Sequence, residues 1–125
     1  MKYKGLAMTI AGSDSGGGAG LQADLKTFQS FDVYGLSAVT SVTAQNTTGV
    51  RSMNDIEPEI VGDQIDMIME DMGCDAVKTG MVSNKEIIKV ISDKIKNYEL
   101  DKLVVDPVMV SKSKARLLKK KEKNR

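Results

Sequence analysis

The sequence has no histidine, one cysteine and no long apolar run. Without histidine, the chain cannot use imidazole for acid–base catalysis or metal binding. The single cysteine, Cys74, excludes an internal disulfide and is typical of a reducing compartment, so the predicted location is cytoplasmic. There is no apolar segment of about eighteen residues and no signal-peptide pattern. We therefore expect no membrane partner.

The composition is typical of one folded domain, but the charge is unevenly distributed. The chain has 125 residues, of which 41% are hydrophobic and 28% charged. Residues 1–111 contain ten Lys/Arg and sixteen Asp/Glu, a balance of −6, whereas residues 112–125 contain eight Lys/Arg and one Glu, a balance of +7. Such a basic tail can bind nucleic acid or an acidic membrane surface.

A glycine-rich segment organises the N-terminal part of the chain. Four glycines fall within five positions, 16–20, between an apolar run at 6–10 and a helical pattern over 20–31. Glycine allows close backbone approach, and a helix N-terminus presents unpaired N–H groups and a partial positive charge. The segment therefore predicts a loop that holds a small polar or anionic ligand. A tight strand-to-helix connection is the alternative.

Two well-known phosphate-binding motifs do not fit this loop. Gly12 and Gly17 have P-loop spacing, but Gly18 and Ala19 follow where the motif needs Lys and Ser or Thr. A dinucleotide fingerprint also requires an acidic residue at the end of the next strand. None lies between Asp32 and Asp55, so a dinucleotide site is not expected.

The rest of the chain alternates predicted strands and amphipathic helices. Strands are predicted at 36–44, 75–79 and 103–105, with a short extended piece at 50–56 and helices at 57–72 and from about 84 to 96. The first of these helices has the apolar stripe Val61, Ile65, Ile68, Met69 and Met72. The second has Ser83 and Glu86 as a capping box and Ile87, Ile88, Ile91 and Ile95 facing inward.

This alternation predicts an α/β fold with a mainly parallel sheet. Ligands of such sheets bind beyond the carboxyl ends of the strands. The four loops of interest, 12–19, 45–49, 80–82 and 106–109, all follow predicted strands. We expect them to meet at one edge of the sheet.

Four motifs together resemble the hydroxymethylpyrimidine/phosphomethylpyrimidine kinases of thiamine biosynthesis, in the ribokinase-like superfamily. They are TIAGSDSGGGAGLQADLKTF, VTAQNTTGV, KTGMV and VDPVMVSKS, and they extend from Thr9 to Ser113. Pyridoxal kinases share the DPV segment, but the long glycine loop followed by QADLKTF favours the pyrimidine enzymes. The resemblance implies a three-layer α/β/α fold, ATP and Mg²⁺ as cofactors, an aminopyrimidine substrate, and homo-oligomers among full-length relatives.

The resemblance also implies a set of binding residues. The substrate-binding residues are Gln45, Gly12, Asp24, Met81 and Val108, and Asp106 lies near the nucleotide phosphates or a cation. An amide such as that of Gln45 offers one donor and one acceptor to an aminopyrimidine edge. Without the resemblance, Met81 and Val108 are equally well explained as core residues. For Gln45, an exposed loop amide is the alternative.

The resemblance covers residues 1–113, and residues 114–125 form a basic tail that departs from the family. It implies a second half, with the catalytic residue, the anion hole and most nucleotide contacts, that this sequence does not contain. We therefore expect the 125-residue chain alone to be inactive. We interpret the lysine-rich ending first as the result of a premature stop, a shifted frame or a deliberate truncation, and second as a nucleic-acid-binding segment. A non-catalytic fragment and a pyridoxal-type kinase are the alternative functions.

Overall fold

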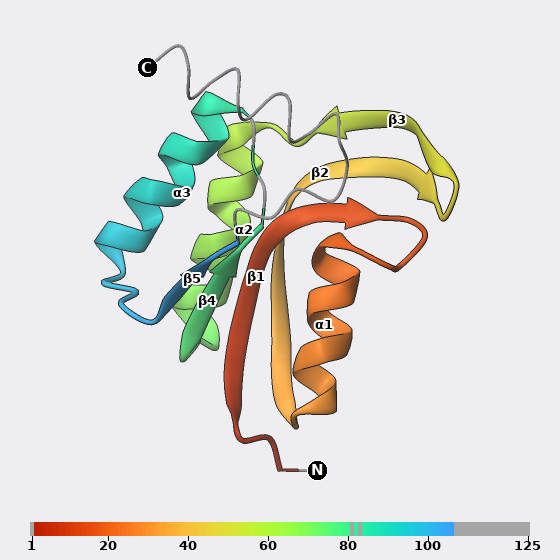
Figure 1. The fold of residues 1–125 in the computed structure, drawn as a ribbon. Coiled ribbons are helices and arrows are strands. Elements are labelled where there is room, and N and C mark those ends of the chain that lie inside the picture. The colour runs from red at the N-terminus through yellow and green to blue at the C-terminus, as the bar shows by residue number, and fades with distance from the viewer. Residues whose placement is uncertain (1, 81, 83, 107–125) are drawn as a thin grey trace.

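The computed structural model describes residues 2–80, 82 and 84–106, which form eight elements. In chain order these are β1 (Gly5–Asp14), α1 (Gly20–Ser30), β2 (Val33–Asn46), β3 (Gly49–Asp55), α2 (Pro58–Asp71), β4 (Ala76–Thr79), α3 (Lys85–Asn97) and β5 (Leu103–Val105). The sheet order is β3-β2-β1-β4-β5, with every pairing parallel except β2–β3. Helix α1 covers one face of the sheet and α2 and α3 cover the other (Figure 1). The prediction of a three-layer, mainly parallel α/β fold is confirmed.

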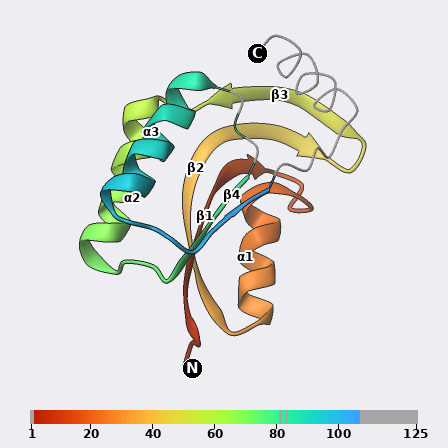
Figure 2. The ribbon, with the colours of Figure 1, turned by 60° about the vertical axis from the view of Figure 1, so that its left-hand side comes forward.

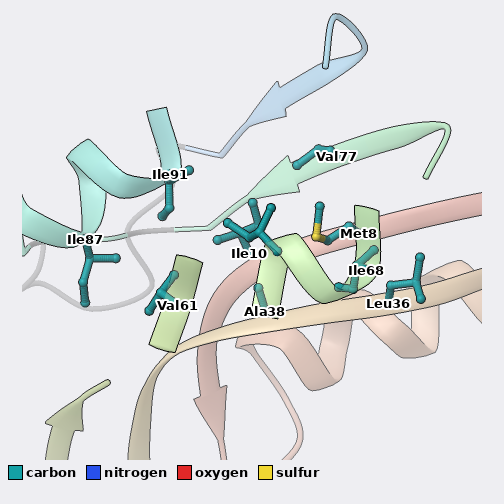
Figure 3. Close-up of a cluster of buried hydrophobic side chains, with 10 residues drawn as sticks. Met8, Ile10, Leu36, Ala38, Val61, Ile68, Val77, Ile87 and Ile91 are labelled. Atoms are coloured by element: carbon teal, nitrogen blue, oxygen red, sulfur yellow. The ribbon is translucent and has the colours of Figure 1, made fainter. Parts of the chain in front are cut away.

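The main hydrophobic core lies between the sheet and the helix pair α2–α3 (Figure 3). Its buried members are Met8, Ile10, Leu36, Ala38, Val61, Ile65, Ile68, Val77, Ile87 and Ile91. Alternate residues of a strand point to opposite faces. Met8 and Ile10 therefore enter this core, while Thr9 between them faces α1 and is also fully buried.

Most helix predictions are confirmed, with corrections at the ends. Pro58 opens α2 as predicted, but Met72 at its end is 48% exposed and does not belong to the buried stripe. The N-cap of α3 is Asn84, whose side chain accepts the N–H of Ile87, so the prediction of Ser83 as the cap is wrong. Ile88 is 44% exposed because it lies about 100° around the helix from Ile87, outside the inward face. No helix in the described ranges is long and apolar enough to cross a membrane.

The β2–β3 hairpin was not expected, because residues 45–49 were predicted to be a loop. The strands continue to Asn46 and resume at Gly49, so only Thr47 and Thr48 form the turn. The Asn46 side-chain oxygen accepts hydrogen bonds from the N–H groups of Thr48 and Gly49. This Asx turn closes the hairpin without the Asn-Gly pair that usually signals one. Figure 2 shows the curved ribbon arching over the end of α1.

A side chain continues the sheet where β3 ends. Strand β2 pairs with β3 from Ser41 to Asn46. Before this stretch, the side-chain amide of Gln64 from α2 forms hydrogen bonds with the backbone of Val39, in the place of a neighbouring strand. Gln64 Oε1 accepts the Val39 N–H at 2.8 Å, and Gln64 Nε2 donates to the Val39 carbonyl at 3.0 Å. The amide thus satisfies a backbone that would otherwise be an open strand edge.

A polar cluster ties the end of α3 to α2. Asp66 accepts hydrogen bonds from the Tyr98 hydroxyl at 2.6 Å and from Lys94 Nζ at 2.7 Å. The hydrogen bond from Lys94, followed by that from Tyr98, lowers the pKa of Asp66 below its usual value. The hydrogen bond that Tyr98 donates to the same carboxylate raises the pKa of Tyr98 to about 12, because ionising the phenol would break this bond and place two negative charges together.

We expect the phenol of Tyr98 to ionise near pH 12 in the folded chain. Its folded pKa lies above the unfolded value of about 10, so its contribution to stability is complete below pH 10 and is lost as the pH rises towards 12. An ultraviolet absorbance titration of phenolate measures this directly. The step near pH 12 should be absent in Tyr98→Phe. If Tyr98→Phe instead lost an absorbance step near pH 10 and kept the step near pH 12, the raised pKa would not belong to Tyr98.

Candidate functional site

The glycine-rich loop is organised around the carboxylate of Asp14. Strand β1 extends to Asp14, four residues beyond the predicted end. The buried Asp14 side chain accepts the N–H of Gly16 at 2.8 Å, of Gly18 at 3.1 Å and of Ala19 at 2.9 Å. Its carboxylate therefore lies where a bound anion would lie at the N-terminus of α1. These three loop N–H groups are already satisfied by the chain itself, which argues against an anion in this cradle.

Two further contacts fix the loop against β1. The Gln22 side chain accepts the Asp14 N–H at 2.8 Å and donates to the Ser13 hydroxyl at 2.7 Å. Gly20 has a φ of +62°, and a Cβ there would lie 2.4 Å from the Gly12 carbonyl oxygen. Only glycine fits this position, because a side chain would be strained and would also overlap β1. The loop is held rigidly by its own sequence.

Gly12 lies at an irregularity of the β1–β2 pairing. The register advances by two residues in β1, from Ala11 to Ser13, and by three in β2, from Val39 to Val42. A Cβ on Gly12 would lie 2.6 Å from the Ser41 hydroxyl. The close contact with Ser41 is thus sufficient to explain why this position is glycine. The close approach of the Gly12 backbone to a substrate stays a prediction.

Gln45 is anchored near the end of β2 by both its backbone and its side chain. Its N–H and carbonyl both bond the Ser15 hydroxyl of the glycine-rich loop, at 2.7 and 2.5 Å. Its side-chain amide lies 3.0 Å from the Thr43 hydroxyl, which also lies 2.7 Å from the Ser13 carbonyl oxygen. One end of the amide is therefore held by Thr43. Among the hydrogen bonds of the described residues, Gln45 Nε2 has no partner.

A charged cluster lies where β1 and β4 meet. Lys78 Nζ contacts both carboxylate oxygens of Asp24, at 2.8 and 3.0 Å, and the Thr9 hydroxyl donates to Asp24 at 2.6 Å. Asp106, directly after β5, lies 3.6 Å from the same Nζ. From β1, the chain adds β2 on one side of the sheet and later adds β4 and β5 on the other side. The boundary between β1 and β4 is therefore the topological switch point of the sheet. Open α/β sheets bind their ligands at such a point.

The described residues do not by themselves fit a magnesium ion. A divalent cation needs several oxygen ligands, and the lysine ammonium lies beside both Asp24 and Asp106, where such a cation would need them. No group of three or more acidic or Cys side chains within the described ranges is arranged to hold a metal.

A cavity of about 180 Å³ lies at the other end of β4 and has no link to the predicted site. Cys74, Tyr98 and Lys102 are among its lining residues. Burial, and secondarily the charge of Asp75, raises the pKa of the Cys74 thiol. A protonated thiol is a poor nucleophile, so the cavity offers no nucleophilic site at Cys74.

Comparison with known proteins identifies the family. A family model described as phosphomethylpyrimidine kinase matches residues 14–125. The chain belongs to this family. It is 54% identical, over 113 residues, to the hydroxymethylpyrimidine/phosphomethylpyrimidine kinase of Bacillus subtilis (strain 168). That match covers 90% of this chain and 42% of the relative, so the chain spans less than half the length of the enzyme that it resembles.

Solved structures of the family and of related vitamin kinases have the same fold. A crystal structure of phosphomethylpyrimidine kinase from Clostridium difficile 630 is 53% identical, with a TM-score of 0.83 over 90% of this chain and 48% of that one. The pyridoxal kinase from Staphylococcus aureus in complex with AMP-PCP and pyridoxal is 36% identical, with a TM-score of 0.75 over 96% of this chain and 44% of that one. The ribokinase-like resemblance of the sequence motifs is thereby confirmed.

The described candidate residues lie toward the edge of the sheet that is formed by the carboxyl ends of the parallel strands. Gly12 and Gln45 lie near the carboxyl ends of the parallel strands β1 and β2, and Asp106 follows the parallel strand β5. Asp24 reaches the same region from α1 through its contacts with β1 and β4. Met81 and Val108 lie outside the described residues, and so does the tail at 114–125.

Sequence reasoning missed the residues that hold the candidate site in place. Lys78 could have been identified from the sequence, because a lysine between the apolar or β-branched residues of a buried strand needs a charged partner. Asp14 could have been named as a candidate, since an Asp directly before a glycine-rich helix start can accept its N–H groups. Thr9 and Thr43 could not, because threonine is common in strands for packing reasons alone.

Proposed function

We propose that this chain is the pyrimidine-binding part of an ATP-dependent hydroxymethylpyrimidine and phosphomethylpyrimidine kinase that serves thiamine biosynthesis in the cytoplasm. The proposal rests on one observation above all. The chain belongs to the phosphomethylpyrimidine kinase family, and the candidate residues Asp24 and Asp106 lie with Lys78 at the switch point of the sheet. As the chain spans 42% of the Bacillus subtilis relative, the activity of the whole enzyme belongs to this proposal.

The polar groups suit an aminopyrimidine better than an anion. The Thr43 hydroxyl donates to Gln45 Oε1, and Gln45 Nε2 can donate to a nitrogen of the ring edge. Asp24 can accept a hydrogen bond from an exocyclic amine. Asp24 is held by Lys78 at 2.8 Å, and we assign to it the role of binding and orienting the substrate. The Asp14 carboxylate in the glycine-rich loop repels a phosphate from that cradle.

ATP is the proposed phosphoryl donor. The Staphylococcus aureus pyridoxal kinase, a structural relative, was solved with AMP-PCP, an ATP analogue. Phosphoryl transfer depends mainly on positioning and on charge that stabilises the transferred group. The described residues supply the positioning of the acceptor alcohol. Mg²⁺ is expected to arrive with the nucleotide, whose phosphates provide most of its oxygen ligands.

The direct test is a hybrid kinase, in which residues 1–113 of this chain are joined to the remaining C-terminal part of the Clostridium difficile enzyme, 53% identical to it over the matching part. We expect this hybrid kinase to phosphorylate hydroxymethylpyrimidine with ATP, and the 125-residue chain alone not to. Pyridoxal serves as a competing substrate, since pyridoxal kinases share the fold. A folded hybrid kinase that phosphorylates pyridoxal and not the pyrimidine would overturn the proposed substrate.

In the hybrid kinase, Gln45→Ala should weaken pyrimidine binding by about 1–3 kcal/mol, because buried polar atoms of the ligand lose their partner. The affinity for ATP should change little. Isothermal titration of each ligand measures both. Thr48→Ala in the hairpin turn is the control, since its hydroxyl bonds Asn46 and no candidate site residue. Unchanged pyrimidine affinity in Gln45→Ala would remove this side chain from the pocket.

A further inference from the structure

Lys78 is an unusual residue for its position. It lies in the middle of β4, between Val77, which is 2% exposed, and Thr79, which is 8% exposed. In the parallel pairing of β1 and β4 it stands opposite Thr9, on the face of the sheet that carries α1. A cation at such a place is costly unless it is paired.

Its partners are two carboxylates from separate elements. Both carboxylate oxygens of Asp24 contact Lys78 Nζ, and Asp106 lies 3.6 Å away. The side chains of Lys78 and Asp24 are 20% and 18% exposed, whereas that of Asp106 is 38% exposed. The ammonium therefore joins α1 to the end of β5 across the switch point of the sheet.

The hydrogen bonds of Asp24 define what it can still bind. A carboxylate has about four acceptor positions, two on each oxygen. Oδ2 accepts from the Thr9 hydroxyl and from Lys78, and Oδ1 accepts from Lys78 alone. Among the contacts of the described residues, one acceptor position on Oδ1 is left. It fits one N–H or O–H donor and repels an anion.

We propose that Lys78 is a positioning residue of the pyrimidine site, which acts through Asp24. It holds this carboxylate in the orientation that leaves one acceptor position on Oδ1 for the amino group of the substrate. It also links that position to Asp106 at the carboxyl end of β5. This inference rests on the proposed function and adds to it a residue that selects ligands with a hydrogen-bond donor.

The chain contains a matched structural ion pair for comparison. Lys94 bonds Asp66 at 2.7 Å, and their side chains are 26% and 27% exposed, much like Lys78 and Asp24. This pair joins α2 to α3, and Asp66 also bonds Tyr98, which lines the cavity at the amino end of β4. Removal of either lysine should cost stability, but only Lys78 should affect the substrate.

The test is steady-state kinetics of the hybrid kinase with hydroxymethylpyrimidine. Lys78→Met should raise the pyrimidine KM roughly ten- to a hundredfold, the usual effect of losing hydrogen bonds to a charged group, with a much smaller change in kcat. Lys78→Arg should restore most of the loss, since it keeps the charge and the donors. Lys94→Met should lower the midpoint of thermal unfolding and leave the KM within about twofold of the parent.

A double-mutant cycle separates positioning from a general structural role. If Lys78 acts through Asp24, Lys78→Met should add little to the KM of Asp24→Asn. Additive effects, or an unchanged KM in Lys78→Met, would overturn the inference. If Lys78→Met does not fold, Asp24→Asn decides alone, because an unchanged KM there removes the carboxylate through which Lys78 acts. A folded parent hybrid kinase without pyrimidine turnover would instead overturn the proposed function.

Discussion

Replacing Asp14 by alanine is expected to open the glycine-rich loop and to lower the free energy of unfolding by about 2–3 kcal/mol. The substitution removes the acceptor of three backbone N–H groups at the start of α1. One of the three is the N–H of Ala19, the N-cap residue of α1, whose own side chain makes no capping hydrogen bond. The loss should be smaller than the sum of three charge-assisted bonds, since Gly16 and Gly18 are exposed and their N–H groups can turn to water.

Urea unfolding of the hybrid kinase measures the total effect, and hydrogen exchange of residues 15–20 locates it. Asp14→Asn keeps one acceptor oxygen without the charge and should lose less than Asp14→Ala. Asp63→Ala is the matched control, because Asp63 is exposed on α2 and should change stability by less than about 0.5 kcal/mol. If Asp14→Ala behaved like this control, the carboxylate would not be what holds the loop.

The acceptor of these loop N–H groups could not be predicted from the sequence. The glycine cluster correctly indicated a loop between a strand and a helix, and α1 begins at Gly20 as predicted. Glycine spacing says that N–H groups are accessible, but not what they bind. The chain supplies its own carboxylate from Asp14, and only the geometry shows this. Three of the loop N–H groups bind this internal carboxylate, and the polar or anionic ligand expected from the glycine cluster stays a prediction.

Periodic signals were more reliable than the signals for ends and turns. The apolar pattern located α2 and α3 and their buried residues Val61, Ile65 and Ile91, because a helix buries side chains at intervals of three and four. The same pattern overreached at Ile88 and Met72, which are exposed. The hairpin was missed because its turn depends on one hydrogen-bonding side chain, that of Asn46.

The positions of the candidate residues at the strand ends were predictable from the sequence, but the contacts between them were not. Parallel strands bring their carboxyl ends together, so the position of residues such as Gln45 and Asp106 follows from the strand pattern. The contacts of Asp24 with Thr9 and Lys78 join positions 15 and 54 residues apart. No local pattern encodes such a pairing, because it depends on how α1 packs against the sheet.

The two edges of the sheet differ in how well they are protected. Strand β3 is fully exposed but carries Arg51, Asn54 and Asp55, polar residues that disfavour pairing with another chain. Strand β5 consists of Leu103, Val104 and Val105, which are 36%, 62% and 62% exposed. It pairs with β4 on one side, and in the described residues no strand pairs on the other. Its free N–H and C=O groups are thus a template for another chain.

A polypeptide of residues 1–125 is therefore expected to self-associate through β5. The flanking Asp101, Lys102 and Asp106 lie outside the strand, so they do not interrupt its apolar edge. Sedimentation velocity over a range of concentrations should show oligomers or aggregates. Co-expression with the C-terminal part of a family enzyme should restore solubility, since the additional strands would cover this edge.

A charged side chain placed on β5 distinguishes association through this strand edge from non-specific hydrophobic aggregation. Val104→Lys should shift the 125-residue polypeptide towards monomer, because an edge lysine opposes strand pairing. Met53→Lys on β3 is the matched control: Met53 is 58% exposed, close to the 62% of Val104, and it lies on the edge that is already protected. This control should associate like the parent. A parent chain that sediments as one compact monomer and unfolds cooperatively would show that β5 is stable as an edge, and that these strands form a self-sufficient domain.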